Sequence, residues 1–401
     1  MVKRRVLVVF LLMSLIVCLG VYLKKQDGTK IEESKSDEQQ VSFKAVGDVL
    51  LEEDIYDWLG NDYDFKDYFS SVENLLKADI MAMNQESIIG GDELGVSKTN
   101  YTFNTPTKIA NQLYDLGFNM VSLANNHSLD MGLKGLNHTI QFWNGKENLI
   151  HAGLYESLED RQKPRILEKN GIKFGFLAYT TFTNKKILTT DEMYKVGYSR
   201  NMKTKVFDQA HQDLIEQEVK QLKAQCDVVV CSMHWGNEGT FKISQQQREM
   251  AEALNKWGVD IILGSHPHVM QPIEWIEQEG HKTLVAYSLG NFISSDPKVD
   301  AYKDEGTAYS LTGVLSLDVI KMENHIDISN VFYTPMINHF EKEGNYHLYS
   351  LDDYTNELAS VHARQQYVEQ PFTKESLQSL VKKVMDLGSV EIKGIGDDVS
   401  E

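Results

Sequence analysis

Residues 227–268 read DVVVCSMHWGNEGTFKISQQQREMAEALNKWGVDIILGSHPH, and this stretch decides the fold class. Its first apolar run, residues 227–233, has the length and the β-branched content of a buried strand. Residues 245–257 have helical periodicity, and residues 260–263 form a second short apolar run. A strand, a helix and a strand in this order predict a βαβ unit, whose two strands lie parallel in one sheet.

The same alternation of short β-rich runs and amphipathic stretches extends on both sides of this unit. Asn170-Gly171 adds a hairpin signal between residues 165–168 and 173–179. The pattern predicts a layered α/β domain with a largely parallel sheet. Further strands are expected at residues 41–46, 80–83, 119–124, 148–151, 283–288 and 311–319, and helices at 65–77, 107–116, 133–143 and 205–225. Residues 336–401 are predicted to form a polar, helical C-terminal tail.

The N-terminus predicts a membrane anchor. Residues 6–23 are an uncharged run of 18 residues that follows Lys3, Arg4 and Arg5. This length is near the ~20 residues that span a bilayer, and the run lacks a small-residue cleavage site, which favours a signal anchor over a cleaved signal peptide. We therefore expect a single-pass protein of the cell membrane, anchored by residues 1–25, with the large domain extracellular. Residues 26–40 are polar and are predicted to be a flexible linker.

Composition excludes several classes of protein. The chain has 401 residues, 42% hydrophobic and 24% charged, which is typical of globular domains and not of disordered or multi-spanning chains. Its length allows two domains, or one large domain with appendages. The formal net charge of −18 argues against a nucleic-acid partner, because nucleic-acid binders present a basic surface. Of three cysteines, Cys18 lies in the anchor, and Cys226 and Cys231 are not expected to pair with each other.

Residues able to bind a metal recur where the predicted strands end. In open α/β sheets, ligands bind outside the carboxyl ends of the strands, so these residues are expected to form one site. Imidazoles together with carboxylates and an amide oxygen suit Mn, Fe or Zn, as one or two divalent ions. The strand-end groups are Gly47-Asp48, Asn84-Gln85-Glu86, Asn125-Asn126-His127, His234-Trp235-Gly236 and Ser265-His266-Pro267-His268.

Some of these residues have alternative interpretations. A His-x-His pattern by itself is weak, and only the joint occurrence at five strand ends favours a metal site. Glu86 or Asp48 is the candidate bridge between two metals, and Asp130 is a candidate for orienting an imidazole. The candidate substrate-binding residues are Trp235, Ser265 and Asn291. Trp235 would either stack on a polymer or only cover the site, and Asn291 would bind substrate or hold a turn.

Six segments together resemble one family. They are FKAVGDVLL (43–51), MNQE (83–86), SLANNHSLDMG (122–132), SMHWGNE (232–238), LGSHPHVMQPIE (263–274) and YSLGNFI (287–293). In this order they resemble the CapA family of capsule and poly-γ-glutamate synthesis proteins, also called PgsA, over residues 41–335. The resemblance implies a four-layered sandwich similar to calcineurin-like metallophosphatases, with helices flanking two β-sheets and a dimetal centre. Family members are bacterial, membrane-anchored and part of the poly-γ-glutamate synthase complex.

The resemblance also implies roles for individual residues. By position they are the metal ligands Asp48, Glu86, Asn126, His234, His266 and His268, and the catalytic acid His127. Glu86 stands where metallophosphatases have a bridging aspartate. One position departs from that pattern, because metallophosphatases begin with Asp-x-His and this chain has Asp48-Val49-Leu50.

Two functions follow as hypotheses, and whether the protein is an enzyme stays open between them. The first is a membrane-anchored extracellular subunit of a poly-γ-glutamate capsule synthesis or export machinery, with a retained metal-binding pocket. Its partners would be the polymer or a related polyanion, membrane-embedded synthase or ligase subunits, and the membrane itself. The second is an active extracellular metal-dependent phosphoesterase or related hydrolase. The chain has no P-loop, so it is not expected to be the ATP-dependent ligase.

Overall fold

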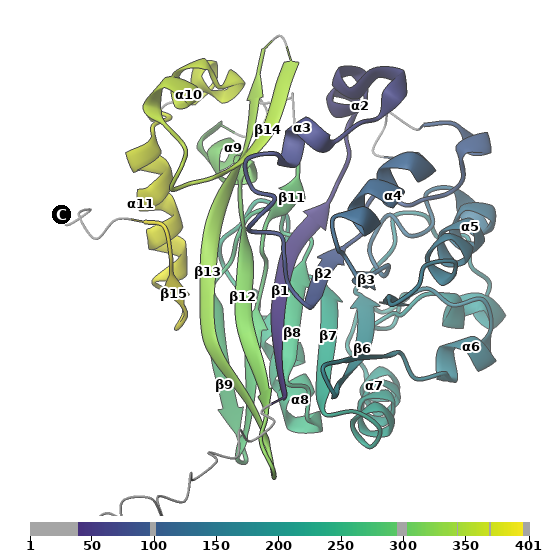
Figure 1. The fold of residues 1–401 in the computed structure, drawn as a ribbon. Helices are drawn as coiled ribbons and strands as arrows, with labels where there is room; N and C mark the ends of the chain where they lie inside the picture. Colours follow the sequence, from purple (N-terminus) through teal and green to yellow (C-terminus); the bar gives the residue numbers. More distant parts are fainter. Residues whose placement is uncertain (1–38, 97–101, 295–302, 343, 369, 396–401) are drawn as a thin grey trace, which may run out of the picture. The chain divides into compact units, whose positions relative to one another are not determined.

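The computed structural model describes residues 39–96, 102–294, 303–342, 344–368 and 370–395. Two β-sheets with helices make up this part of the chain, which confirms the predicted mixed α/β class (Figure 1). The predicted anchor, and the predicted linker up to residue 38, lie outside the described residues; Gln39 and Gln40 already belong to the first strand. Within the described ranges, no helix is both long and apolar enough to cross a membrane.

The first sheet has a parallel half and an antiparallel half. Its strands are β1 (Gln39–Val49), β2 (Ile80–Asn84), β3 (Met120–Ser122), β4 (Ile150–Ala152), β11 (Asn291–Ile293), β12 (Leu311–Lys321), β13 (Ile326–Glu341), β14 (Gly344–Ser350) and β15 (Glu391–Ile392). The order is β14-β13-β12-β1-β2-β3-β4, with β11 beside β1 and β15 beside β13. β1 to β4 are parallel neighbours, whereas β12, β13 and β14 pair antiparallel.

The second sheet is parallel in its centre and antiparallel at both edges. Its strands are β5 (Ile166–Lys169), β6 (Ile172–Thr180), β7 (Val228–His234), β8 (Ile261–Ser265), β9 (Ile273–Gln278) and β10 (His281–Ala286), in the order β5-β6-β7-β8-β10-β9. The predicted hairpin is present between β5 and β6. Its turn residues Asn170 and Gly171 have φ angles of 48° and 77°, as a two-residue hairpin turn requires.

Alternate residues of the central strands face different hydrophobic cores. In β1, Phe43 and Ala45 belong to a core that both sheets share, whereas Val46 belongs to the core beneath the helices of the first sheet. In β7, Val230 faces the shared core and Val229 faces the helices of the second sheet. This period of two is the pleat of a strand buried on both faces. The two sheets therefore pack against each other, with helices on their outer faces.

Most of the helices fall into three groups (Figure 1). The first sheet is covered by α2 (Glu53–Leu59), α3 (Lys66–Phe69), α4 (Thr107–Asp115) and α5 (Gly132–Asn144), and the second by α7 (Gln209–Lys223) and α8 (Gln245–Trp257). α10 (Asn356–Val361) and α11 (Lys374–Met385) pack into the shared core on the side of β13. The remaining helices are α6 (Leu158–Gln162) and α9 (Lys303–Ser310).

The predicted helix at residues 65–77 is mostly a series of turns. Only α3 is helical there, although Phe65, Phe69, Val72 and Leu76 are buried at helical spacing. The N–H groups of Val72 and Leu76 donate to carbonyls three residues back, not four. The apolar periodicity therefore reflects tighter turns of the 3₁₀ kind, which bury the same face.

The predicted helical tail at residues 336–401 is wrong in its first part. β13 continues to Glu341 and β14 follows it, so residues up to 350 complete the first sheet. Helices occur only beyond them, and β15 then returns to pair with β13. The cause is non-local pairing, which the polar composition of this region does not reveal.

Two glycines permit a close approach of strand ends. A Cβ atom on Gly47 in β1 would lie 1.8 Å from the carbonyl oxygen of Gly290, and one on Gly264 in β8 would lie 2.0 Å from that of Tyr287. Neither position has room for a side chain. The chain before β11 therefore reaches the ends of β1 and β8, where the polar strand-end residues lie.

Candidate metal centre

The strand ends of both sheets bring the predicted ligands together. The register of β1 on β2 sets Asp48 beside Asn84, and that of β7 on β8 sets His234 beside Ser265. The sheets are linked here, since the His266 N–H donates to Asp48 Oδ2 at 3.1 Å. The residues gathered are Asp48, Glu86, Asn126, His127, His234, His266 and His268, none more than 7% exposed.

Glu86 lies at the centre of this cluster without a hydrogen-bond partner. Its side chain is fully buried, and neither carboxylate oxygen is hydrogen-bonded to any described residue. His234 Nε2 and His268 Nε2 lie 3.6 and 3.9 Å from Glu86 Oε1. Burial, and secondly the charge of Asp48, raises the pKa of Glu86 well above its usual range. A buried carboxylate with unsatisfied oxygens is costly, and a cation beside it would offset that cost.

The ring of His234 is fixed from both sides. Its Nε2 lies 3.0 Å from Asn126 Oδ1, and its Nδ1 lies 2.9 Å from Ser265 Oγ. Burial, followed by the charges of His266 and His268, keeps the pKa of His234 well below its usual value. The imidazole is therefore neutral, which is the form that binds metals.

The loop after β8 holds two histidines in left-handed backbone conformations. The φ angles of His266 and His268 are 94° and 58°, on either side of Pro267. Such angles are rare for residues with a Cβ and tend to occur at functional sites. Burial, and then the neighbouring His268, lowers the pKa of His266 to about 3. Burial alone would lower the pKa of His268 too, but the carboxylates of Glu86 and Asp48 outweigh it and raise that pKa to about 10.

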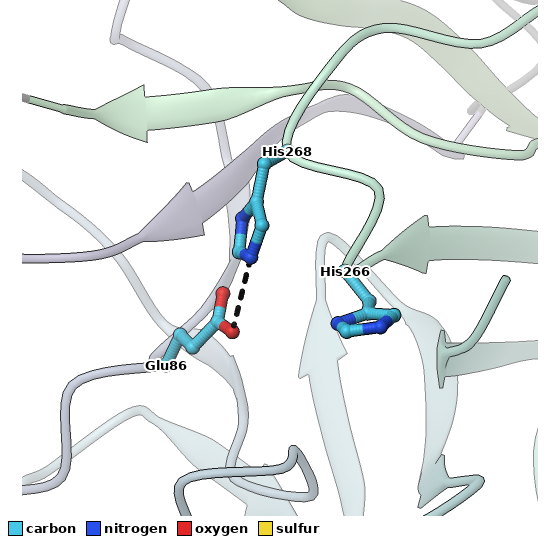
Figure 2. Close-up of side chains that lie close together, drawn as sticks. All are labelled: Glu86, His266 and His268. Carbon is cyan, nitrogen blue, oxygen red and sulfur yellow. Dashed lines mark ion pairs between the residues drawn. The ribbon is translucent and has the colours of Figure 1, made fainter. Parts of the chain in front are cut away.

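These side chains fit a divalent metal. Asp48, Glu86 and His234 form one group of potential ligands, and Glu86, His266 and His268 form a second (Figure 2). Ligand atoms ~2.1 Å from a tetrahedral metal lie about 3.4 Å from one another. The separations of His234 Nε2 from Asn126 Oδ1 (3.0 Å) and from Glu86 Oε1 (3.6 Å) match that geometry. Glu86 is common to both groups, as a bridging ligand would be.

The position that departs from the metallophosphatase pattern adds no ligand. Leu50, two residues after Asp48, is buried and apolar. His266 Nδ1, by contrast, is buried and has no hydrogen-bond partner within the described chain. The second group of ligands therefore depends on Glu86 and the two histidines of the loop after β8.

His127 lies next to this cluster and pairs with Asp130. The His127 Nδ1 lies 2.8 Å from Asp130 Oδ2, which also accepts the N–H of Phe103. The Phe103 ring packs edge-on against the imidazole, with ring centroids 4.6 Å apart. The carboxylate orients the ring, as Asp130 was predicted to orient an imidazole, and leaves Nε2 without a partner in the described structure.

The three candidate substrate residues have other contacts. Trp235 is fully buried, stacks on Tyr287 and donates its indole N–H to the Tyr287 carbonyl, which favours the covering role over stacking on a polymer. Ser265 Oγ lies 2.9 Å from His234 Nδ1, and Asn291 Oδ1 lies 2.9 Å from His268 Nδ1. Ser265 and Asn291 thus orient histidines and do not face an open cleft.

Sequence reasoning placed Asn84 at a strand end of the site but gave it no role, and it missed the segment after β6. Asn84 donates to Asp48 Oδ1 at 2.7 Å and lies 3.4 Å from His234, so it holds one residue from each sheet. The segment after β6, residues 181–186, also crosses the site. The Thr181 N–H donates to the His234 carbonyl, and the Phe182 ring centroid lies 5.2 Å from that of His266. A polar residue that closes a buried strand was the available signal for Asn84, whereas residues 181–186 contain no such pattern.

Comparison with known proteins assigns the family. Residues 42–296 match the family described as bacterial capsule synthesis protein PGA_cap, and the chain belongs to it. The PGA biosynthesis protein CapA of Bacillus subtilis (strain 168) is 29% identical over 298 residues, which are 71% of this chain and 70% of that protein. The capsule biosynthesis protein CapA of Bacillus anthracis is 26% identical over 321 residues, 76% of this chain and 74% of that protein.

Two solved structures are distantly similar. The calcineurin-like phosphoesterase YfkN from Bacillus subtilis aligns with a TM-score of 0.42 and 15% identity, over 82% of this chain and 97% of that chain. A hypothetical protein from Thermus thermophilus aligns with a TM-score of 0.41 and 13% identity, over 73% of this chain and 99% of that chain. Similarity this low carries no argument about activity, so the chemistry of the site rests on its own residues.

Proposed function

We propose that this protein is a membrane-anchored, extracellular subunit of a machinery that synthesises or exports poly-γ-glutamate capsule. Membership of the capsule synthesis family supports this role, as do two CapA relatives named for PGA and capsule biosynthesis. The uncharged run at residues 6–23 behind three basic residues supports the anchor and its orientation. Its partners would be the polymer, or a related polyanion, and membrane-embedded synthase or ligase subunits.

The proposal includes a working metal pocket, and Glu86 is the observation that carries it. A fully buried carboxylate whose two oxygens have no hydrogen-bond partner among the described residues, beside the neutral imidazole of His234, is a ligand arrangement that suits a divalent cation. The residues that would hold divalent Mn, Fe or Zn are Asp48, Glu86, Asn126, His234, His266 and His268. Bound there, the ion would act as a Lewis acid toward a carboxylate, carbonyl or phosphoryl oxygen.

Other residues of the chain would prepare the pocket for an anionic group. Asn84, Ser265 and Asn291 hold Asp48, His234 and His268 in place, so the ligand atoms are preorganised. His127, oriented by Asp130, would present Nε2 as a hydrogen-bond donor to the same group. An anchored pocket of this kind suits the holding of a carboxylate-bearing polymer as it leaves the membrane.

Replacement of both loop histidines tests the pocket and the role together. The full-length His266→Ala/His268→Ala protein should lose stoichiometric metal by elemental analysis, and cells that carry it should lose polymer output. His325→Ala, on the exposed turn before β13, is the matched control and should retain both. Metal content equal to that of the parent chain in the double variant would disprove the site. Normal polymer output from a metal-free variant would disprove a role of the metal site in capsule synthesis.

A second candidate, an extracellular metal-dependent phosphoesterase, is favoured by the His127–Asp130 pair. An imidazole held by a carboxylate beside a metal is placed to act as a general acid toward a leaving group. If this hypothesis holds, the metal-loaded parent chain should hydrolyse bis-p-nitrophenyl phosphate. His127→Ala should keep its metal and lose about 10²–10⁴-fold in rate. No hydrolysis by the loaded parent, combined with lost polymer output in the His127→Ala variant, would leave only the capsule role.

A further inference from the structure

Four cations in the connection between β6 and α7 form what we call the basic rim: Lys185, Lys186, Arg200 and Lys205. None of them forms an ion pair in the part of the chain that the structure describes. Lys185 Nζ donates to the backbone carbonyl of Asp130, in the loop that carries His127. The rim thus begins at the loop that presents the candidate proton donor.

Arg200 connects the rim to the metal centre. Its Nε donates to the Thr181 carbonyl at 2.6 Å, and its Nη1 donates to Gln246 Oε1 at 3.1 Å. Both acceptors are uncharged. The residue after Thr181 is Phe182, whose ring contacts the His266 imidazole.

The remaining two cations extend the rim toward solvent. Lys186 and Lys205 are both exposed. Burial, and then the positive charges of Lys186 and Arg200, lowers the pKa of Lys205, so the three charges lie near one another. They repel one another, and no carboxylate of the described residues forms an ion pair with them.

This arrangement is unusual for the composition of the chain. With 58 acidic residues against 40 lysines and arginines, carboxylates are plentiful, yet the rim has none as a partner among the described residues. Like charges without a partner lower the stability of the folded protein. Such clusters are typical of sites that bind an external anion. A guanidinium next to a metal pocket is well suited to a carboxylate or phosphoryl group, because its N–H groups match the geometry of paired oxygens.

We propose that the basic rim is an anion subsite, in which Arg200, Lys186 and Lys205 bind successive carboxylates of an extended polyanion. One group of the polyanion then lies at the metal centre, beside His127 and Lys185. This inference rests on the proposed function, because it takes the polymer as the occupant. It adds the path of the polyanion, which runs from the metal centre along the segment after β6 and out past Lys205.

The test measures binding of a γ-linked decaglutamate to the full-length, Mn²⁺-loaded protein in detergent. Lys186→Gln/Lys205→Gln removes two exposed charges without disturbing a packed group, and Arg200→Gln removes the inner one. Each should raise the Kd by about tenfold or more, which is the loss of one or more charge-assisted contacts. The salt dependence of binding should also weaken. Arg200→Lys should restore part of the affinity.

A matched control and a second probe separate the outcomes. Lys169→Gln/Lys173→Gln removes two lysines from the β5–β6 hairpin and should leave the Kd unchanged. Equal Kd values in the rim variants and this control, with metal bound normally, would overturn the subsite and leave the proposed function standing. Binding of inorganic phosphate that depends on the rim, without binding of decaglutamate, would keep an anion site and reject the polymer as occupant. A parent chain that binds neither probe would overturn both.

Discussion

A single conservative substitution at Glu86 tests the metal centre. In Glu86→Gln the shape of the side chain is kept, but the charge and one ligand oxygen are lost. We expect the affinity for Mn²⁺ to fall by roughly 100-fold or more, since ligand changes exceed the 10–100-fold seen for supporting residues. The rise in Tm on adding Mn²⁺ should shrink accordingly, because ligand stabilisation follows the ratio of free metal to Kd. Thermal melts with Mn²⁺ and with EDTA measure this.

The control for that exchange is Glu277→Gln, an exposed glutamate of β9. It should show the same metal-dependent rise in Tm as the parent chain. A full rise in Tm for Glu86→Gln would mean that the buried carboxylate does not bind the ion, and the bridging role would have to be abandoned.

His151 in β4 gives a pH dependence that is independent of the metal. Burial, and secondly the charge of Arg165, lowers its pKa to about 4, and its Nε2 lies 2.9 Å from Asn144 Oδ1. The unfolded chain, with a pKa near 6.5, takes up a proton that the folded chain excludes. The contribution of His151 to stability is therefore complete above about pH 6.5 and is lost as the pH falls toward 4.

From pH 7 to pH 5 this loss amounts to about 2 kcal/mol in the free energy of unfolding. The parent chain should lose that much more stability over this interval than His151→Gln, which cannot take up the proton. Urea unfolding followed by tryptophan fluorescence, with EDTA present to keep metal binding out of the comparison, measures the difference. Parallel pH curves for the two proteins would show that His151 is not held neutral.

At the level of single residues, the sequence predicted which side chains meet but not all of their roles. Asp48, Glu86 and the histidines follow strands, and the carboxyl ends of parallel strands share an edge, so their convergence is predictable. The direction of each side chain depends on the register at the strand end, where a shift of one residue exchanges the faces. Sequence therefore left Trp235 either stacking on the substrate or covering the site, and the structure places it in the core. Arg200 was missed because its position depends on a long connection between strands.

Among the elements, the end of β1 is the most sensitive to packing. Gly47→Ala would put a Cβ atom 1.8 Å from the Gly290 carbonyl oxygen, which itself accepts the N–H of Asp48 at 3.0 Å. One strand must move. We expect a loss of about 1–3 kcal/mol in unfolding free energy together with weaker metal binding, because Asp48 moves with the backbone.

Gly145→Ala at the end of α5 is the matched control, since its added Cβ would have no neighbour closer than 3.4 Å. It should melt like the parent chain and retain its metal. If Gly47→Ala behaves in the same way as this control, the close approach of β1 to the chain before β11 does not constrain the site.

Elements with local signals were predicted well and those made by distant pairing were not. The βαβ unit at residues 227–268 is present as β7, α8 and β8, and α8 has the Ser244–Gln247 capping box and Gly258 in a left-handed conformation at its end. β14 has no such signals, because its partner β13 defines it. Polar sequence with weak alternation does not distinguish an edge strand from an exposed helix.

At the scale of the whole molecule, the N-terminal sequence predicts the membrane topology. If residues 6–23 cross the membrane with the basic residues inside, protease added to intact protoplasts should digest the large domain and leave a short membrane-bound stub. A cytoplasmic enzyme in the same cells should survive until lysis and serves as the control. Survival of the large domain until lysis would reverse the orientation.

The metal ligands come from both sheets, and this has a consequence for how long the protein stays folded. Asp48, Glu86 and Asn126 lie at or just after the ends of strands of the first sheet, and the three histidines at or just after the ends of strands of the second. A bound ion would therefore cross-link the two sheets at their carboxyl ends. The sheets could separate at this end only after the ion has dissociated. The rate of ion release would then limit the rate of unfolding. If the domain lies outside the cell, as proposed, it takes its ions from the surroundings, and its folded lifetime would vary with the trace-metal content of the medium.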